Sequence, residues 1–306
     1  MTTGTPMVRF GTDAVRISGS GAPALFLHGV PDTSALWEDV IVGVEDRFHC
    51  FAPDLPGFGE SELPEGFSFD LRAYGQHINR LVEACGIETP LTLVLHDWGA
   101  IFGLSFAAQF PDKVAAIVGA SFPFSHLYRW HTWARIWQTP GLGELSMLMM
   151  NHPLFSHEIR RGSKNLDTAT IRRMFASANR PTTKATILKL YRSAPPYAFT
   201  ELQAELRRHI DASRIQLLWG DSDPYIPSHF GRQIPHERIV IVEGCGHWLP
   251  SEYPEAVIRT LTTILTDSLR GTSRELTSVS ATLAPHQRPP ADDLESAHPH
   301  KTTGVA

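Results

Sequence analysis

The stretch Leu93–Ala100, LVLHDWGA, passes from an apolar run into a histidine, a carboxylate, an indole and a glycine. A short, continuous apolar run is typical of a strand that is covered on both faces. The residues that follow, 99–109, form a helix-like segment that ends before Pro111. The aspartate at this turn has two interpretations. Asp97 caps the helix, because aspartate is a favoured N-cap residue, or it is a nucleophile held at the end of the strand.

The same alternation of apolar runs and helix-like segments extends along the chain on both sides of this stretch. The apolar runs are residues 24–28, 48–54, 91–95, 114–120, 214–219 and 238–242. The helix-like segments are residues 71–84, 99–109 and 254–265. Such alternation predicts an α/β fold, with a mostly parallel twisted sheet flanked by helices.

Residues 124–208 interrupt this alternation, because they are rich in helix formers and large side chains and contain no clear strand. We therefore predict a helical cap, or lid, over 124–208, inserted between two strands and lying over the strand ends, where ligands bind in open α/β sheets. The core domain would consist of residues 1–123 and 209–266. Residues 267–306 are rich in Ser, Thr, Pro and His without periodicity, which predicts a disordered C-terminal tail.

The composition excludes several kinds of partner. The chain has 306 residues, 42% of them hydrophobic, a formal net charge of −5 and no block of Lys or Arg, which argues against binding to nucleic acid or to an anionic membrane. Its three cysteines form no C-x-x-C pair, as expected in a reducing compartment. The first residues lack the features of a signal peptide, and no apolar run is long enough to span a membrane. These features predict a cytoplasmic protein.

Two later apolar runs are each followed by a residue that could complete a catalytic triad. Acidic residues occur in residues 218–224, LWGDSDP, and a histidine, His247, occurs in residues 243–248, EGCGHW. The order nucleophile, acid, histidine is that of α/β-hydrolases. After the first apolar run comes HGVP, in which the backbone N–H of Val30 could join that of Trp98 in an oxyanion hole.

Five motifs in this order, LFLHGVP, PDLPGFGES, LVLHDWGA, LLWGDSDPYIP and GCGHWLP, resemble those of the α/β-hydrolase fold over roughly residues 20–265. The HDWG element resembles the branch with an aspartate nucleophile, which comprises haloalkane dehalogenases and epoxide hydrolases. No G-x-S-x-G motif is present, which disfavours an esterase. The residues after Asp97 contain none of the arginines that fluoroacetate-type dehalogenases carry there.

The resemblance implies a two-step hydrolysis of a small-molecule substrate, without metal or organic cofactor. Asp97 attacks a saturated carbon and forms an alkyl ester, whose carbonyl oxygen lies in the oxyanion hole of Val30 and Trp98. His247 then deprotonates the water that cleaves the ester, while an acid orients its imidazole. Asp223 matches the family's G-x-x-D pattern after Gly220 and is the predicted acid.

Other polar residues near these motifs have structural interpretations. We expect Asp221 to act in a cap or turn, Asp54 to brace its loop, and His28 and His96 to be hydrogen-bonded core residues.

Two donor sets compete for the leaving group. A departing halide would be bound by the indole N–H groups of Trp98 and Trp133, the latter in a segment that resembles the lid of one dehalogenase subfamily. Against this, Val30 stands where dehalogenases place Asn or Glu. An opening epoxide would need two lid tyrosines. Tyr191 resembles the second, but the first would fall at Trp133.

Because both tryptophans and only one tyrosine are present, the sequence predicts a haloalkane dehalogenase-like enzyme, with an epoxide hydrolase as the alternative. A third interpretation is a non-catalytic relative that binds a small molecule in the same pocket. The lid composition suggests an apolar pocket, although four polar residues of the lid could also line it. These are Arg129, Arg135, His126 and His131.

Overall fold

The computed structural model describes residues 6–125, 127–193 and 198–266. Within them one eight-stranded sheet has the order β1-β2-β4-β3-β5-β6-β7-β8. In this order the strands from β4 to β8 are parallel to one another, whereas β2 pairs antiparallel with both β1 and β4. The bounds are β1 Met7–Phe10, β2 Asp13–Ser18, β3 Ala22–Leu27, β4 Phe48–Pro53, β5 Leu91–His96, β6 Val114–Ala120, β7 Ile215–Gly220 and β8 Arg238–Val242. The predicted α/β architecture is confirmed.

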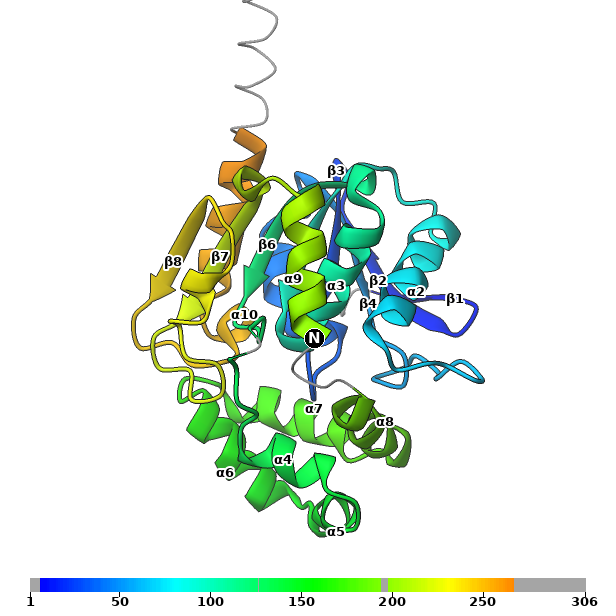
Figure 1. Cartoon of the computed structure of the whole chain (residues 1–306), viewed down its shortest axis with the longest axis vertical. Helices are drawn as coiled ribbons and strands as arrows, with labels where there is room; N and C mark the ends of the chain where they lie inside the picture. Colours follow the sequence, from blue (N-terminus) through cyan, green and yellow to red (C-terminus); the bar gives the residue numbers. More distant parts are fainter. Residues whose placement is uncertain (1–5, 126, 194–197, 267–306) are drawn as a thin grey trace, which may run out of the picture. The chain divides into compact units, whose positions relative to one another are not determined.

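Helices cover both faces of this sheet (Figure 1). On one face α2, Leu71–Ala84, and α9, Ala198–His209, pack on either side of α3, Asp97–Gln109. Behind the sheet lie α1, Glu38–Val42, and the helix of residues 254–266, which follows the short α10, Leu249–Glu252. Helix α9 falls within the interval that we predicted as cap, yet it packs against α3 at the sheet.

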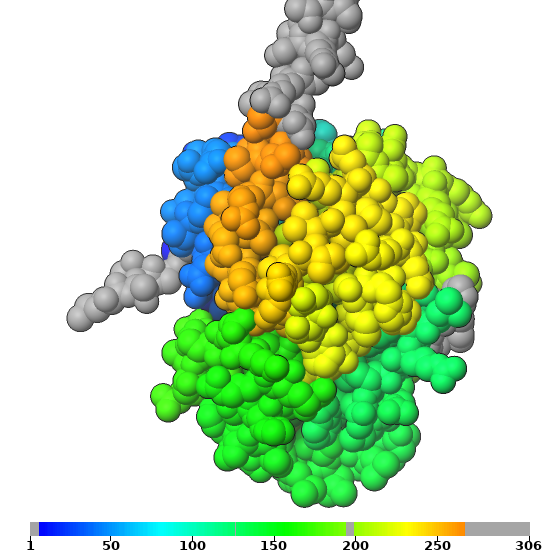
Figure 2. Space-filling model, turned by 90° about the vertical axis from the view of Figure 1, so that its left-hand side faces the viewer, coloured from blue at the N-terminus to red at the C-terminus, as the bar shows by residue number. Residues whose placement is uncertain are grey.

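The remaining helices gather beyond the carboxyl ends of the parallel strands (Figure 1). In Figure 2 they are the green surface below the yellow segment that carries β8. They are α4 Thr132–Gln138, α5 Leu142–Met149, α6 His152–Gly162, α7 Thr168–Ala178 and α8 Pro181–Ser193. This layer lies where the sequence predicts a cap.

The centre of the fold is the contact between β5 and α3. Every residue of β5 is buried, and α3 is buried from Asp97 to Ala107. The strand that leads to the predicted nucleophile is thus held on all sides. Among the described residues, no helix is both long and apolar enough to cross a membrane. The predicted tail, residues 267–306, lies outside the described residues.

Candidate active site

Asp97 occupies a strained turn that its neighbours are built to accommodate. It is the first residue of α3, directly after β5, and its φ of +49° lies in the left-handed region that non-glycine residues rarely adopt. A Cβ on Gly29 would lie 2.4 Å from the Cβ of Asp97, and one on Gly99 would lie 2.3 Å from the carbonyl oxygen of His28. Glycine is therefore required at both positions for the turn to bring Asp97 close to the loop after β3.

The contacts of Asp97 do not support the capping interpretation. The N-cap of α3 is His96, and no side chain caps that helix end. The Asp97 carboxylate instead accepts a hydrogen bond from the backbone N–H of Val30, with 3.0 Å between N and Oδ1. Burial raises the pKa of Asp97, whereas the charge of His247 and the backbone N–H groups of Val30 and Trp98 oppose that shift. The two predicted oxyanion donors thus both act on this carboxylate.

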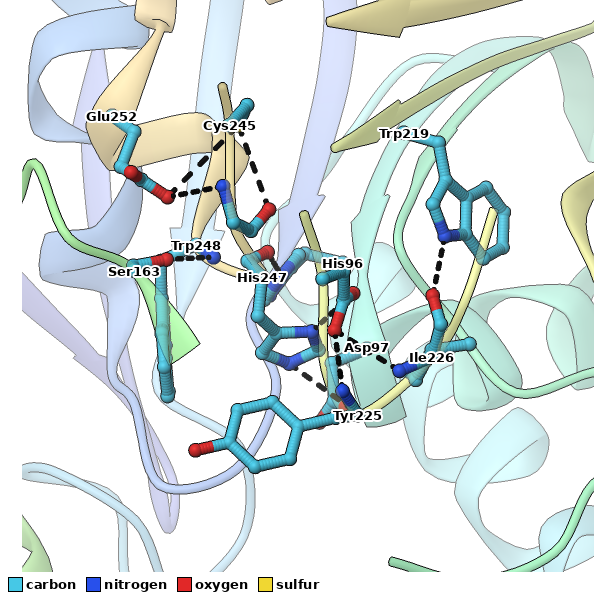
Figure 3. A network of polar contacts seen from close by, with 12 residues as sticks. His96, Asp97, Ser163, Trp219, Tyr225, Ile226, Cys245, His247, Trp248 and Glu252 are labelled. Carbon is cyan, nitrogen blue, oxygen red and sulfur yellow. Dashed lines mark hydrogen bonds and ion pairs between the residues drawn. The ribbon is translucent and has the colours of Figure 1, made fainter. Parts of the chain in front are cut away.

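His247 lies between the two other predicted catalytic residues. Its Nδ1 is 2.9 Å from Oδ2 of Asp223 and its Nε2 is 3.8 Å from Oδ2 of Asp97. The other oxygen of Asp223 accepts the backbone N–H groups of Tyr225 and Ile226, at 2.8 and 3.0 Å. These hydrogen bonds fix the Asp223 carboxylate so that its other oxygen contacts Nδ1 of His247. The Nε2 of His247 therefore faces Asp97. Figure 3 shows His96, Asp97, Tyr225 and His247 together at this point.

The charges around His247 favour its protonated form. Burial lowers the pKa of His247, but the charge and hydrogen bond of Asp223, and the charges of Asp97 and Asp32, outweigh burial and raise the pKa above its ordinary value. Asp32 is itself buried, which raises its pKa to about 7, and it accepts the indole N–H of Trp248 at 2.6 Å. Asp32 was not predicted from the sequence, where only its position two residues after Val30 indicates a role at the site.

The residues expected to be structural make local hydrogen bonds. Asp221 is exposed and accepts the backbone N–H of Gly244 at 2.9 Å. Nε2 of His28 accepts the backbone N–H of Leu55, and Nε2 of His96 lies 2.9 Å from the carbonyl oxygen of His247. The Asp54 carboxylate accepts the backbone N–H groups of Ser34 and Glu60.

A cavity of about 280 Å³ opens beside the carboxylate, between the sheet ends and the cap helices. Asp97, His247 and Val30 line it from the core side. Most of the remaining wall is aromatic or aliphatic and comes from the cap. This enclosure is the kind of site that small-molecule enzymes use, an apolar pocket with a few polar groups.

The two predicted halide donors do not meet in this cavity. Trp98 is fully buried, is not part of the cavity wall and stacks on Trp130, with 5.5 Å between ring centroids. Trp133 lines the cavity and packs on Trp137. Although burial raises the pKa of Glu158, hydrogen bonds from Arg161, Tyr225 and the Trp133 indole lower it below its ordinary value. The N–H of Trp133 is thus directed toward Glu158.

Tyr191, by contrast, lies in the cavity close to Asp97. Burial and the charge of Asp97 raise its pKa well above the ordinary value, while the indole N–H of Trp98 opposes that shift. The Trp98 N–H itself forms no hydrogen bond within the described residues. The hydroxyl of Tyr191 is likewise bound to no acceptor among them, so its O–H is able to donate into the cavity that this residue lines.

His131 is a second polar donor at the same place. Its ring is 6.2 Å from that of Tyr191, and its Nδ1 accepts the backbone N–H of Ala134 at 3.3 Å. Burial lowers the pKa of His131 to about 4, so the ring is neutral at pH 7 and carries its proton on Nε2. The described residues offer Nε2 no hydrogen-bond partner.

The other polar lid residues that the sequence offered for the pocket do not line the cavity within the described residues. Arg129 and Arg135 are exposed and are not part of the cavity wall, and His126 lies outside the described residues. Tyr128, which was not predicted from the sequence, lines the cavity and donates its hydroxyl to the carbonyl oxygen of Tyr225 at 3.1 Å. Neither a motif nor a periodic pattern marks Tyr128 in the sequence.

The fold and the site together define a class of protein. It is an α/β fold with a helical layer over the site, in which Asp97, Asp223 and His247 have the chain order and the arrangement of a hydrolytic triad. The family model described as the alpha/beta hydrolase family matches residues 24–260, and the chain belongs to that family. The recognition made from the five motifs is thereby confirmed.

The similar proteins include both haloalkane dehalogenases and epoxide hydrolases, the two classes of enzyme that the motifs suggested. Haloalkane dehalogenase 2 of Mycobacterium bovis is 28% identical, over 78% of this chain and 86% of the relative. The structure of a haloalkane dehalogenase variant from Bradyrhizobium elkanii has a TM-score of 0.72 at 23% identity, covering 88% of this chain and 98% of that one. An epoxide hydrolase from Vigna radiata has a TM-score of 0.67 at 22% identity, covering 86% and 97%. At these identities the two structures establish the fold alone.

Proposed function

We propose that this chain hydrolyses an epoxide to a vicinal diol through an alkyl ester on Asp97. The observation that carries the proposal is the set of donors at the cavity. The O–H of Tyr191 and the Nε2–H of His131 are free to donate there, whereas the indoles of Trp98 and Trp133 do not converge. An opening epoxide develops an alkoxide, which neutral O–H and N–H donors stabilise.

In the first step Oδ2 of Asp97 attacks an epoxide carbon, because Oδ1 is already bound by the N–H of Val30. The carbon–oxygen bond of the ring breaks, and the leaving oxygen takes the proton of Tyr191 while His131 donates a hydrogen bond to it. Ester formation removes the charge of Asp97, which is one cause of the raised pKa of Tyr191. The phenol therefore becomes a stronger acid as the ring opens.

In the second step His247 acts as general base on a water molecule. Its Nε2 is 3.8 Å from Asp97, too far for a direct hydrogen bond but suitable for a bridging water. The water attacks the carbonyl carbon of the Asp97 ester, and the N–H groups of Val30 and Trp98 stabilise the oxyanion that forms. Asp223 stabilises the imidazolium through the 2.9 Å contact with Nδ1. Collapse of the tetrahedral intermediate breaks the bond to the substrate oxygen, which takes up the remaining proton of the attacking water, so that the diol leaves and Asp97 returns to its carboxylate form. The proton that His247 took from the water passes back to the Tyr191 phenolate, which restores both groups.

The helices α4 to α8 would act as the cap in this reaction. Tyr191 lies on α8, and His131 is the N-cap residue of α4. Both proposed donors therefore come from the cap, while the nucleophile and the base come from the core. The cap also excludes bulk water from the ester, so that only a water held by His247 is positioned to attack.

Displacement of a halide is the second candidate, and the 28% identity to haloalkane dehalogenase 2 favours it. The same Asp97, His247 and Asp223 would serve, since only the leaving-group donors differ. A halide needs no proton, so Tyr191 would be dispensable.

A panel of 1,2-epoxyalkanes and 1-haloalkanes, assayed separately for diol and for halide, distinguishes the candidates. We expect diol without halide release, and loss of several orders of magnitude of activity in Asp97→Asn, whose near-isosteric side chain preserves the fold. Halide release without diol would select the second candidate. No product from either series, in a folded protein that binds both, would favour the non-catalytic interpretation.

A further inference from the structure

Helix α5 presents an apolar face to solvent. Leu142, Leu145 and Leu148 are 54%, 50% and 81% exposed, and their three-residue spacing places them on one side of the helix. Met149, at 60%, extends this side. Apolar residues exposed next to one another on a soluble protein mark a binding surface more often than scattered ones do.

This face is continuous with the wall of the active-site cavity. Met149 and Leu154 both line the cavity, although each is more than half exposed to solvent, Leu154 at 56%. Along α6 the cavity-lining side chains become progressively covered, from Leu154 through the half-buried Phe155 to Ile159, which is 3% exposed. The cavity therefore opens where α5 ends and α6 begins. We call Met149, Met150, Leu154 and Phe155 the mouth.

The two ends of the cavity differ in polarity. Asp97, His247 and the two donors line the inner end, whereas the mouth consists of two methionines, a leucine and a phenylalanine. The single charged residue of α5, Glu144, is paired with Arg192, with 2.7 Å between the charged groups. The mouth therefore offers apolar contact and no free charge from α5 for an ionic partner.

We propose that the mouth binds the alkyl chain of a long-chain substrate whose reactive group lies at Asp97, an inference that rests on the proposed function. The substrate class is then a lipophilic terminal epoxide rather than a compact or charged one. Met149 and Met150 suit this role, because the unbranched side chain of methionine adapts its shape to flexible apolar ligands. The outer leucines of α5 extend the same apolar path beyond the mouth.

The first test is a series of 1,2-epoxyalkanes of four to twelve carbons. The KM should fall about twofold to fourfold with each methylene that enters the mouth, and then level off. Leu154→Gln and Met149→Gln should each lower the ratio of kcat/KM for the longest to the shortest substrate about tenfold. The matched control is Val42→Gln on α1, where the native valine is 68% exposed and is not part of the cavity wall, and this variant should keep the ratio.

A binding measurement separates this inference from the proposed function. In Asp97→Asn, 1-alkanols of four to twelve carbons should displace the dye 1-anilinonaphthalene-8-sulfonate with increasing affinity, and Leu154→Gln should remove that increase. This result would support the chain site even if no epoxide were hydrolysed. Hydrolysis without any dependence on chain length would overturn the chain site and leave the proposed function intact.

The same exposed face could alternatively meet a second copy of the chain, and sedimentation velocity tests this outcome. We expect a monomer. A dimer that Leu148→Gln dissociates, together with a chain-length profile that Leu154→Gln leaves unchanged, would assign the face to self-association and overturn the proposal.

Discussion

Removal of one hydroxyl, in Tyr191→Phe, tests the ring-opening step of the proposed reaction. The ring of Tyr191 is 4% exposed and packs against Trp98, Trp130 and Trp137, with centroid distances of 5.2, 5.3 and 4.9 Å. Phenylalanine keeps these contacts, so the fold and the cavity should persist. The substitution removes only the donor to the developing alkoxide.

The size of the effect follows from the charge on that oxygen. A hydrogen bond to a charged group contributes ~1.5–3 kcal/mol, which corresponds to roughly a 10- to 160-fold slower alkylation. The Nε2–H of His131 remains as a second donor, so activity should be reduced rather than abolished. Hydrolysis of the ester should keep its rate, because Tyr191 takes no part in that step.

Rapid-mixing single-turnover kinetics with an epoxide, followed by tryptophan fluorescence, resolve the two steps. The control is Trp133→Phe, which also removes one donor from a large aromatic side chain of the cavity wall and should leave alkylation within about twofold, because its N–H is directed toward Glu158. Thermal unfolding verifies that both variants are folded. Wild-type alkylation in Tyr191→Phe, combined with a tenfold or larger loss in Trp133→Phe, would refute the proposed donor assignment and make Trp133 the donor to the leaving oxygen.

Three further predictions concern the triad. His247→Gln should leave alkylation and stop ester hydrolysis, so that mass spectrometry finds the substrate mass added to the peptide with Asp97; a variant that still turns over without an adduct would argue for direct attack by water. Asp223→Asn should lower kcat by two or more orders of magnitude, whereas the exposed Asp221→Asn should lie within a few-fold of wild type, and similar losses would contradict the assignment of the acid. The charge of Asp97 helps to raise the pKa of His247, and ester formation removes that charge. Because His247 must be neutral to act as the base, the rate of ester hydrolysis should rise with pH through the pKa of His247 in the ester intermediate. This rise should occur at lower pH than the titration of His247 followed by NMR in the free protein. A rise at the same or higher pH would contradict this electrostatic account.

The parts of the fold that local sequence determines were predictable. Helix α2 has the predicted bounds, Leu71–Ala84, because its apolar residues recur with helical period and Asp70 caps its first turn with a 2.8 Å hydrogen bond to the N–H of Ala73. Strand β5 was recognisable as a continuous apolar run, since both of its faces are buried. Strands β1 and β2 were missed, because β1 is a four-residue edge strand that is partly exposed and the polar residues of β2, DAVRIS, break its apolar pattern.

The sequence by itself determined the family, the fold class and the order in which Asp97, Asp223 and His247 follow their strands, because each of these depends on short motifs and on local periodicity. Only the tertiary structure decided which donors face the cavity. Trp98 lies next to Asp97 in sequence, yet its indole is buried beneath Trp130, while His131 and Tyr191, 60 residues apart in sequence, both line the cavity beside Asp97, with 6.2 Å between their ring centroids. The direction of an N–H or O–H group depends on the packing of distant segments against one another, and no periodicity along the chain records that packing.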